Sequence, residues 1–141
     1  MKISKDLCLK TDEELDRMSR VPYASAIGSI IYAMTCTRSD VSFSLSMMIR
    51  HQQNPGEGHW TAVKNILKYL RITKDRFLVY GGEEELRVTS YCYASWQTDK
   101  EDSRSQSDWI FLRNEGAVTW KTSMQDTMAD STCESLVRIE R

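Results

Sequence analysis

Long apolar runs are missing from this sequence of 141 residues. No stretch approaches the roughly 20 consecutive apolar residues that a helix needs to cross a bilayer. The first 20 residues carry charges throughout and have no apolar centre, which is unlike a secretory signal peptide. We therefore expect an intracellular protein, in the cytoplasm or nucleus, with no membrane partner.

Paired cysteines and a strong net charge are also missing. The net charge is −1, so the chain as a whole is not a polycation. The two histidines, His51 and His59, have no third ligand at metal-binding spacing, and no CxxC pair occurs, which disfavours a zinc site. We expect buried or free thiols, as in a reducing compartment, at the four widely separated cysteines Cys8, Cys36, Cys92 and Cys133.

Signatures of common catalytic sites are absent as well. The sequence contains no G-x-S-x-G nucleophile elbow, and no glycine-rich phosphate loop follows a strand pattern. Three acids of the polar stretch 97–107, Asp99, Glu101 and Asp102, are expected to belong to a solvated loop. The composition, 40% hydrophobic and 28% charged, is that of one ordinary soluble domain.

The N-terminal half of the chain has helical periodicity. Residues 1–20 are polar, with a weak helix over 11–20 that Thr11 and Glu14 could start as a capping box; disorder is the alternative. A small-residue helix follows Pro22, where Gly28 would permit close approach of a neighbour. Asp40 is expected to cap a second helix. The apolar side of this second helix would consist of Val41, Leu45, Met48 and Ile49.

The best-specified stretch runs from His59 to Tyr80 and predicts a long helix that turns into a strand. Apolar residues recur at spacings of three and four and predict one buried helical stripe of Trp60, Val63, Leu67 and Leu70, widened by Ile66. Phe77–Tyr80 is a short β-prone run closed by two glycines. The helical segments together predict an N-terminal helical layer.

The second half of the chain has strand periodicity. We expect Phe77–Tyr80 and Leu86–Tyr93 to form a hairpin, followed by strands at 108–112 and 117–120, joined by a turn at 113–116. Ser131 and Glu134 have the spacing of a capping box at the start of a last helix. The predicted fold class is α+β, a helical layer followed by an antiparallel four-stranded sheet.

A local basic region lies on and after the long helix. From Arg50 to Arg76 there are six basic residues and two acidic ones, a local balance of +4. We define the basic ridge as the side chains of Lys64, Lys68, Arg71, Lys74 and Arg76. It could contact nucleic-acid phosphates, which are bound without sequence preference. A solvated helix face would have the same spacing, and without further information we favour it.

Three segments of the chain carry a family resemblance. VPYASAIGSIIYAMTCTRSD, NPGEGHWTAVKNILKYLRITKDRFLVYGG and TDKEDSRSQSDWIFLRNEGAVTWKTSMQDTMADST resemble, in order and spacing, the Pol polyprotein of Ty1/copia-type LTR retrotransposons. The resemblance covers residues 21–134. It implies that residues 21–80 are a helical remnant of the reverse-transcriptase thumb and connection region, and that residues 83–141 are a truncated RNase H-like domain. The polymerase palm would lie upstream.

The resemblance also implies where catalytic ligands would stand. The family strand G-Y-T-D-A-[DS]-[WF] aligns with 90–96, which puts its first aspartate at Tyr93. The family helix S-T-x-E-A-E-Y aligns with 131–137, which puts its metal-binding glutamate at Leu136, and beyond Glu134 the match ends. RNase H chemistry needs paired Mg²⁺ ions held by carboxylates. A phenol and an aliphatic side chain cannot replace those carboxylates, so we expect no bound metal cofactor.

These expectations lead to one main hypothesis and two alternatives. The chain is interpreted as a catalytically inactive fragment of a copia-type Pol polyprotein. One alternative is a residual nucleic-acid-binding module that contacts an RNA–DNA hybrid or another duplex weakly through the basic ridge. The other is a repurposed secreted effector-like protein acting in host cells, which the absence of a signal peptide and of an R-x-L-R stretch disfavours. An exposed edge of the truncated sheet also predicts self-association.

Overall fold

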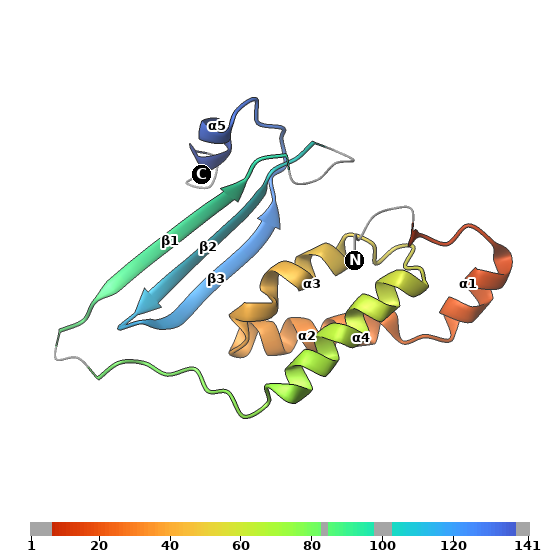
Figure 1. Cartoon of the computed structure of the whole chain (residues 1–141), viewed down its shortest axis with the longest axis horizontal. Helices are drawn as coiled ribbons and strands as arrows, with labels where there is room; N and C mark the ends of the chain where they lie inside the picture. Colours follow the sequence, from red (N-terminus) through yellow and green to blue (C-terminus); the bar gives the residue numbers. More distant parts are fainter. Residues whose placement is uncertain (1–6, 83–84, 98–102, 138–141) are drawn as a thin grey trace. The chain divides into compact units, whose positions relative to one another are not determined.

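The computed structural model describes residues 7–82, 85–97 and 103–137. The chain divides into two compact units, Met1–Phe77 and Leu78–Arg141. The first unit carries the helices α1 to α4, and the second carries a β-sheet and the helix α5 (Figure 1). The loop acids predicted at Asp99, Glu101 and Asp102 lie outside the described residues. Within the described part of the chain, none of the helices is both long enough and apolar enough to span a membrane.

The helix α1, Asp12–Ser19, begins with the predicted capping box. The Glu14 backbone N–H donates to Thr11 Oγ1 at 3.3 Å, and the Thr11 N–H donates to Glu14 Oε2 at 3.3 Å. Acidic residues in its first turn add favourable interaction with the positive end of the helix dipole. Met18 is buried and joins this polar helix to the core. Residues 12–19 are therefore helical, as the capping pattern indicated.

The core of the first unit is formed by α2, Tyr23–Cys36, α3, Ser42–Ile49, and α4, Glu57–Ile72. A short 3₁₀ helix, Ser39–Val41, leads into α3. Tyr23 is buried and its hydroxyl donates to the Met48 carbonyl at 3.1 Å, which ties α2 to α3. The buried apolar side chains are Met18, Tyr23, Ile27, Ile30, Val41, Leu45, Met48, Val63 and Ile66.

The apolar stripe predicted for α4 is confirmed only in part. Val63 is buried, and Trp60 and Leu70 are partly buried against the core, whereas Leu67 is 36% exposed. The buried line instead follows His59, Val63 and Ile66. The prediction missed His59 because its imidazole is polar, and a pattern of hydrophobic residues could not assign it to the buried face of α4.

Three predictions for the preceding helices are wrong. A Cβ built on Gly28 meets nothing within 4 Å, so this glycine does not serve a close helix contact. Asp40 does not cap a helix; its carboxylate accepts hydrogen bonds from Arg38 and Tyr69. Ile49, expected on the apolar side of α3, is 40% exposed.

The sheet of the second unit has three strands in the described residues, and the predicted four-stranded sheet is not found. The strands are β1, Val88–Ser95, β2, Gln106–Arg113, and β3, Gly116–Met124, all antiparallel in the order β1-β2-β3. β1 is an edge strand, and self-association through it stays a prediction. Whether the unit has an RNase H-like fold also stays a prediction.

Residues 79–81 contact the sheet without joining its ladder. The Tyr80 hydroxyl donates to the Ala117 carbonyl at 2.9 Å, and the Gly81 N–H donates to the Asn114 carbonyl at 2.8 Å. A Cβ on Gly116 would overlap the Tyr80 ring, so glycine permits this close approach. Side-chain and turn contacts therefore replace the predicted strand pairing.

The turn between β2 and β3 is where it was predicted. Asn114 and Glu115 have φ of 45° and 68°, the left-handed values required for a tight hairpin turn. Asn114 also binds the chain before the sheet: its Oδ1 accepts from the Arg87 N–H at 2.9 Å and its Nδ2 donates to the Gly81 carbonyl at 3.2 Å. Asn114 thus connects the β2–β3 turn to the chain at Gly81 and at Arg87.

The last helix, α5, Thr132–Val137, begins as predicted, since the Glu134 N–H donates to Ser131 Oγ at 3.1 Å. Gln125 anchors it, because its Nε2 donates to Ser107 Oγ at 2.7 Å and to the Ser135 carbonyl at 2.6 Å. Trp96 Nε1 donates to the buried Ala129 carbonyl at 3.0 Å, which fixes the loop before α5.

Candidate nucleic-acid interface and ligand positions

The basic ridge is exposed over its whole length. Lys64, Lys68 and Arg71 lie on α4 at spacings of four and three, on one face of the helix, and Lys74 and Arg76 follow its end. Their side chains form no ion pair with any other described residue. The positive charge of this surface is therefore available to a ligand.

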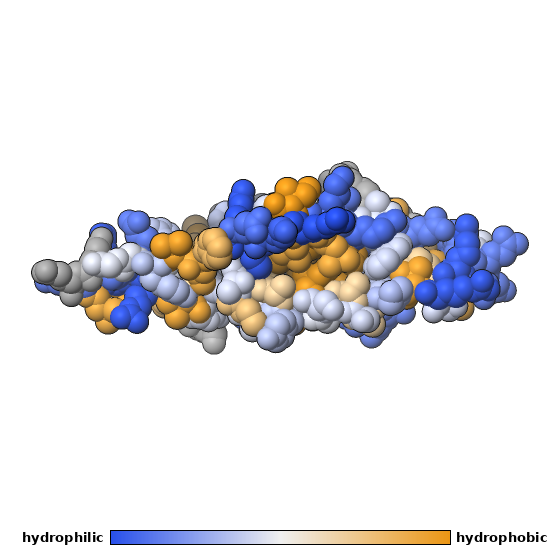
Figure 2. Space-filling model, turned by 90° about the horizontal axis from the view of Figure 1, so that it is seen from below, coloured by the Kyte–Doolittle hydropathy of each residue, from blue (hydrophilic) through white to orange (hydrophobic). Residues whose placement is uncertain are grey.

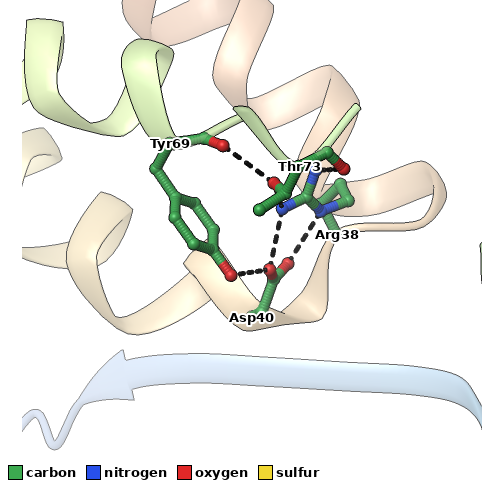
Figure 3. A network of polar contacts seen from close by, with 4 residues as sticks. All are labelled: Arg38, Asp40, Tyr69 and Thr73. Carbon is green, nitrogen blue, oxygen red and sulfur yellow. Dashed lines mark hydrogen bonds and ion pairs between the residues drawn. The ribbon is translucent and has the colours of Figure 1, made fainter. Parts of the chain in front are cut away.

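A polar network holds the end of α4 beside the start of α3 (Figure 3). Arg38 Nε and Nη2 donate to the two Asp40 carboxylate oxygens at 3.0 and 2.8 Å, and Nη2 also donates to Thr73 Oγ1 at 2.6 Å. The Tyr69 hydroxyl donates to Asp40 Oδ2 at 2.7 Å. Since Thr73 precedes Lys74 directly, the network fixes the backbone from which the last two ridge residues extend.

The network is electrostatically favourable. Hydrogen bonds from Arg38, followed by that from Tyr69, hold the pKa of Asp40 below its usual value against the opposing effect of burial. The same Asp40 hydrogen bonds raise the pKa of Arg38. The Arg38 guanidinium also lies 5.3 Å from the Tyr69 ring centroid, within cation–π range. Both charges of the pair therefore persist at neutral pH.

An apolar groove lies between α3 and α4, next to this network. It encloses about 540 Å³. Phe43, 48% exposed, and Tyr69, 38% exposed, belong to its walls. Hydrophobic side chains reach the surface in patches between hydrophilic stretches (Figure 2). The other wall residues are Asp40, Val41, Ser44, Met47, Met48, Ala62, Asn65 and Ile66.

The two positions that the resemblance aligns with catalytic carboxylates lie on separate elements of the second unit. Tyr93 is on β1 and 60% exposed, and Leu136 is on α5 and 46% exposed. In the strand register, Tyr93 faces Asp108, and Asp108 faces Thr122. Asp108 is thus the acid that the ladder places beside Tyr93. One carboxylate beside a neutral phenol does not match the donor set of a paired-magnesium site.

Asp108 is a residue that sequence reasoning missed. Its Oδ1 is buried and has no hydrogen-bond partner among the described residues. Only the register of β1 against β2 brings it to Tyr93, so no spacing in the sequence indicated it.

The histidines require a correction. The sequence separates them from every cysteine, yet the fold gathers Cys8, His51 and His59 so that one potential ligand atom of each lies within 4.8 Å of the others. The fold thus brings a third potential ligand to the two histidines, which the spacing in the sequence did not indicate. The contact between distant segments could not be derived from the sequence spacing.

Comparisons with known proteins agree with the resemblance. The chain is 39% identical over 135 residues to a retrovirus-related Pol polyprotein from transposon TNT 1-94 of Nicotiana tabacum, covering 96% of this chain and 10% of that protein. It is 27% identical over 116 residues to the corresponding polyprotein from transposon RE2 of Arabidopsis thaliana. No protein-family model and no solved structure matches the chain.

A shorter relative matches over most of its own length. The chain is 35% identical over 117 residues to a protein of Plasmopara viticola named secreted RxLR effector protein 161, covering 83% of this chain and 82% of that protein. The effector function in this name is that of the Plasmopara viticola protein. The match shows that related chains of similar length exist.

The similarities establish the class, a region of a retrotransposon Pol polyprotein. More specifically, the chain belongs to the Ty1/copia-type Pol family. It spans about a tenth of the tobacco polyprotein, whose activities belong to a much longer chain.

Proposed function

We propose that this Pol-derived chain has no RNase H activity. The observation that supports the proposal is the residue pair Tyr93 and Leu136, which stand where the family has carboxylates. A neutral phenol and an aliphatic side chain supply no anionic oxygen, so two mutually repelling Mg²⁺ ions would not be held. The domain assignments, a thumb and connection remnant over 21–80 and an RNase H-like remnant over 83–141, belong to the same proposal.

The test is cleavage of an RNA–DNA hybrid by the purified chain with Mg²⁺ or Mn²⁺. We expect no cleavage above that of a protein-free reaction. Cleavage that copurifies with the chain and disappears in an Asp108→Asn variant would show that Asp108 and other acids form a working metal site, and the proposal would be wrong.

We further propose a second function, sequence-independent binding of duplex nucleic acid through the basic ridge. It is supported by the five exposed cations, which form no ion pair with other described residues. If all five contact phosphates of B-DNA, the salt slope is about −4.5, and affinity falls about 500-fold between about 50 and about 200 mM salt.

An electrophoretic mobility shift with duplex DNA and an RNA–DNA hybrid tests this function. The triple variant Lys64→Gln, Lys68→Gln, Arg71→Gln should reduce the magnitude of the salt slope by about 2.7. A control variant with Lys10, Arg17 and Arg20 changed to Gln removes the same charge from the same unit and should keep the slope. Equal effects of the two variants, or no shift at low salt, would exclude the ridge as the binding surface.

The effector function named for the Plasmopara viticola relative is not transferred to this chain. The sequence contains no R-x-L-R stretch, and its identity to the tobacco Pol polyprotein, 39%, is higher than its identity to this relative, 35%.

A further inference from the structure

We propose that Cys8, His51 and His59 form a binding site for one Zn²⁺ ion in the helical unit. One potential ligand atom from each of the three residues lies within 4.8 Å of the others. One thiolate and two imidazoles are a donor set suited to zinc, which takes three protein ligands and a water in sites with an open fourth position. This site is separate from the basic ridge and from the magnesium positions of the family.

The three ligands come from segments that the fold holds together. Cys8 precedes α1, His51 follows α3, and His59 lies in the first turn of α4. His59 is fully buried, while Cys8 and His51 are half-buried. The two imidazole rings stack with centroids 4.3 Å apart and planes at 21°. The buried ring forms the fixed part of the site, and the half-buried residues border solvent, from which an ion can enter.

Two glycines allow the N-terminal segment to approach α4. A Cβ on Gly56 would overlap the Leu7 carbonyl oxygen, and a Cβ on Gly58 would lie 2.9 Å from the Leu7 side chain. Asn54 Nδ2 donates to the Leu9 carbonyl at 3.4 Å, on the other side of Cys8. The residues on both sides of Cys8 thus hold it against the segment 51–59, which contains the two histidines.

Binding an ion requires a small closure of this cluster. Ligands about 2.0–2.3 Å from a tetrahedral zinc are separated from one another by about 3.3–3.7 Å. From a separation of up to 4.8 Å, the ligand atoms must therefore approach one another by up to about 1.5 Å. Stacked rings aim their in-plane lone pairs in parallel, so one ring must turn. The half-buried His51 is the ring with room to do so.

Zinc binding also changes the protonation of the site. Cys8 loses its thiol proton to solvent, and both imidazoles bind in the neutral form, so affinity should fall in acid. His59 Nδ1 now accepts from the Gly56 N–H at 3.0 Å. Coordination through Nε2 would put the ring proton on Nδ1 and break this hydrogen bond. The ion therefore replaces a helix-start hydrogen bond with three metal bonds.

The expected consequence is a link between the N-terminal segment around Cys8 and the segment 51–59, which lie far apart in sequence. Binding to the folded state alone stabilises it by mass action, so the unfolding temperature should rise with Zn²⁺ concentration. The segment around Cys8 should gain protection from proteolysis, because its thiolate is bound to α3–α4.

The test is titration of the full chain, reduced and freed of metal, with Zn²⁺ by calorimetry and with Co²⁺ by absorption. We expect one ion per chain and a thiolate-to-cobalt charge-transfer band. Cys8→Ser should abolish the band, and His51→Gln should weaken binding at least tenfold. Cys36→Ser, which removes an exposed cysteine of the same unit, should leave both unchanged.

His59 is buried, so its replacement could unfold the unit; Cys8→Ser and His51→Gln are therefore the deciding variants. Circular dichroism of each confirms that the helices are retained. Absence of binding by the folded chain would overturn the proposal. A cobalt spectrum without the thiolate band, or equal affinity in the Cys8→Ser, His51→Gln double variant, would also overturn it. Nucleic-acid binding is measured separately and decides none of these outcomes.

Discussion

Replacing Asp40 by asparagine should destabilise the helical unit by about 1–2 kcal/mol. Asp40 accepts two bonds from Arg38, at 2.8 and 3.0 Å, and one from Tyr69, at 2.7 Å. Net contributions of about 1.5–3 kcal/mol are typical of hydrogen bonds to charged groups. The side chain of Asp40 is 38% exposed and that of Arg38 is 12% exposed, so solvent screening reduces this value towards the about 0.2–1 kcal/mol of exposed pairs.

Urea unfolding followed by circular dichroism measures the effect. The midpoint should fall while the m-value stays constant. A small domain loses about 4–8 °C of unfolding temperature per kcal/mol, so thermal unfolding of this unit should shift by about 4–16 °C. The matched control is Asp16→Asn, since Asp16 pairs with Arg20 at 2.8 Å between side chains that are 66% and 77% exposed. That pair should contribute at most about 0.5 kcal/mol.

The pH dependence provides a second measurement. The pKa of Asp40 is lowered in the folded state, chiefly by the Arg38 hydrogen bonds. Its contribution to stability is therefore present above the unfolded pKa of about 3.9 and is lost as the pH falls through the lower folded pKa. The difference between wild type and Asp40→Asn should shrink in that acid range. Equal destabilisation by Asp40→Asn and Asp16→Asn at neutral pH would refute the assigned role of the network.

Three further predictions concern other parts of the chain. Burial, with a smaller effect of Cys8, raises the pKa of Tyr23 to about 12, so stability should decline as the pH rises from about 10 through that value, and Tyr23→Phe should flatten the decline in alkaline urea titrations. Gly116→Ala should destabilise the sheet unit by about 1–3 kcal/mol through overlap with Tyr80, whereas Gly82→Ala, with open space around its Cβ, should not. Gly28→Ala should stabilise α2 by about 0.5–1 kcal/mol in thermal unfolding, because alanine favours the helix and meets no neighbour.

Short-range features of this chain were accessible from the sequence. The capping boxes at Thr11 and Ser131 depend on residues three positions apart, and both form hydrogen bonds of the predicted kind. The turn at 113–116 was predicted from its polar residues and glycine, and its positive φ angles lie at Asn114 and Glu115. Interactions within one turn of chain are encoded locally, so local patterns suffice to predict them.

The buried face of α4 and the number of strands in the sheet were harder to predict from the sequence. Hydrophobicity placed Leu67 in the buried stripe together with Val63 and Ile66, but the neighbouring helices leave Leu67 36% exposed and bury His59. Phe77–Tyr80 has strand propensity, yet Tyr80 uses its side chain to bind the sheet and its backbone stays outside the ladder. Which face of an element is covered depends on the partner that covers it.

The sequence by itself determined the family, the basic ridge and the side chains at the two positions that the resemblance aligns with metal ligands, because these depend on residue type and order. Only the tertiary structure decided that Asp108 stands beside Tyr93, that Arg38, Asp40 and Tyr69 hold the end of α4, and that one cysteine meets two histidines. Each of these sites joins residues separated along the chain. Their proximity results from packing of the core and pairing of the strands, which no local spacing records.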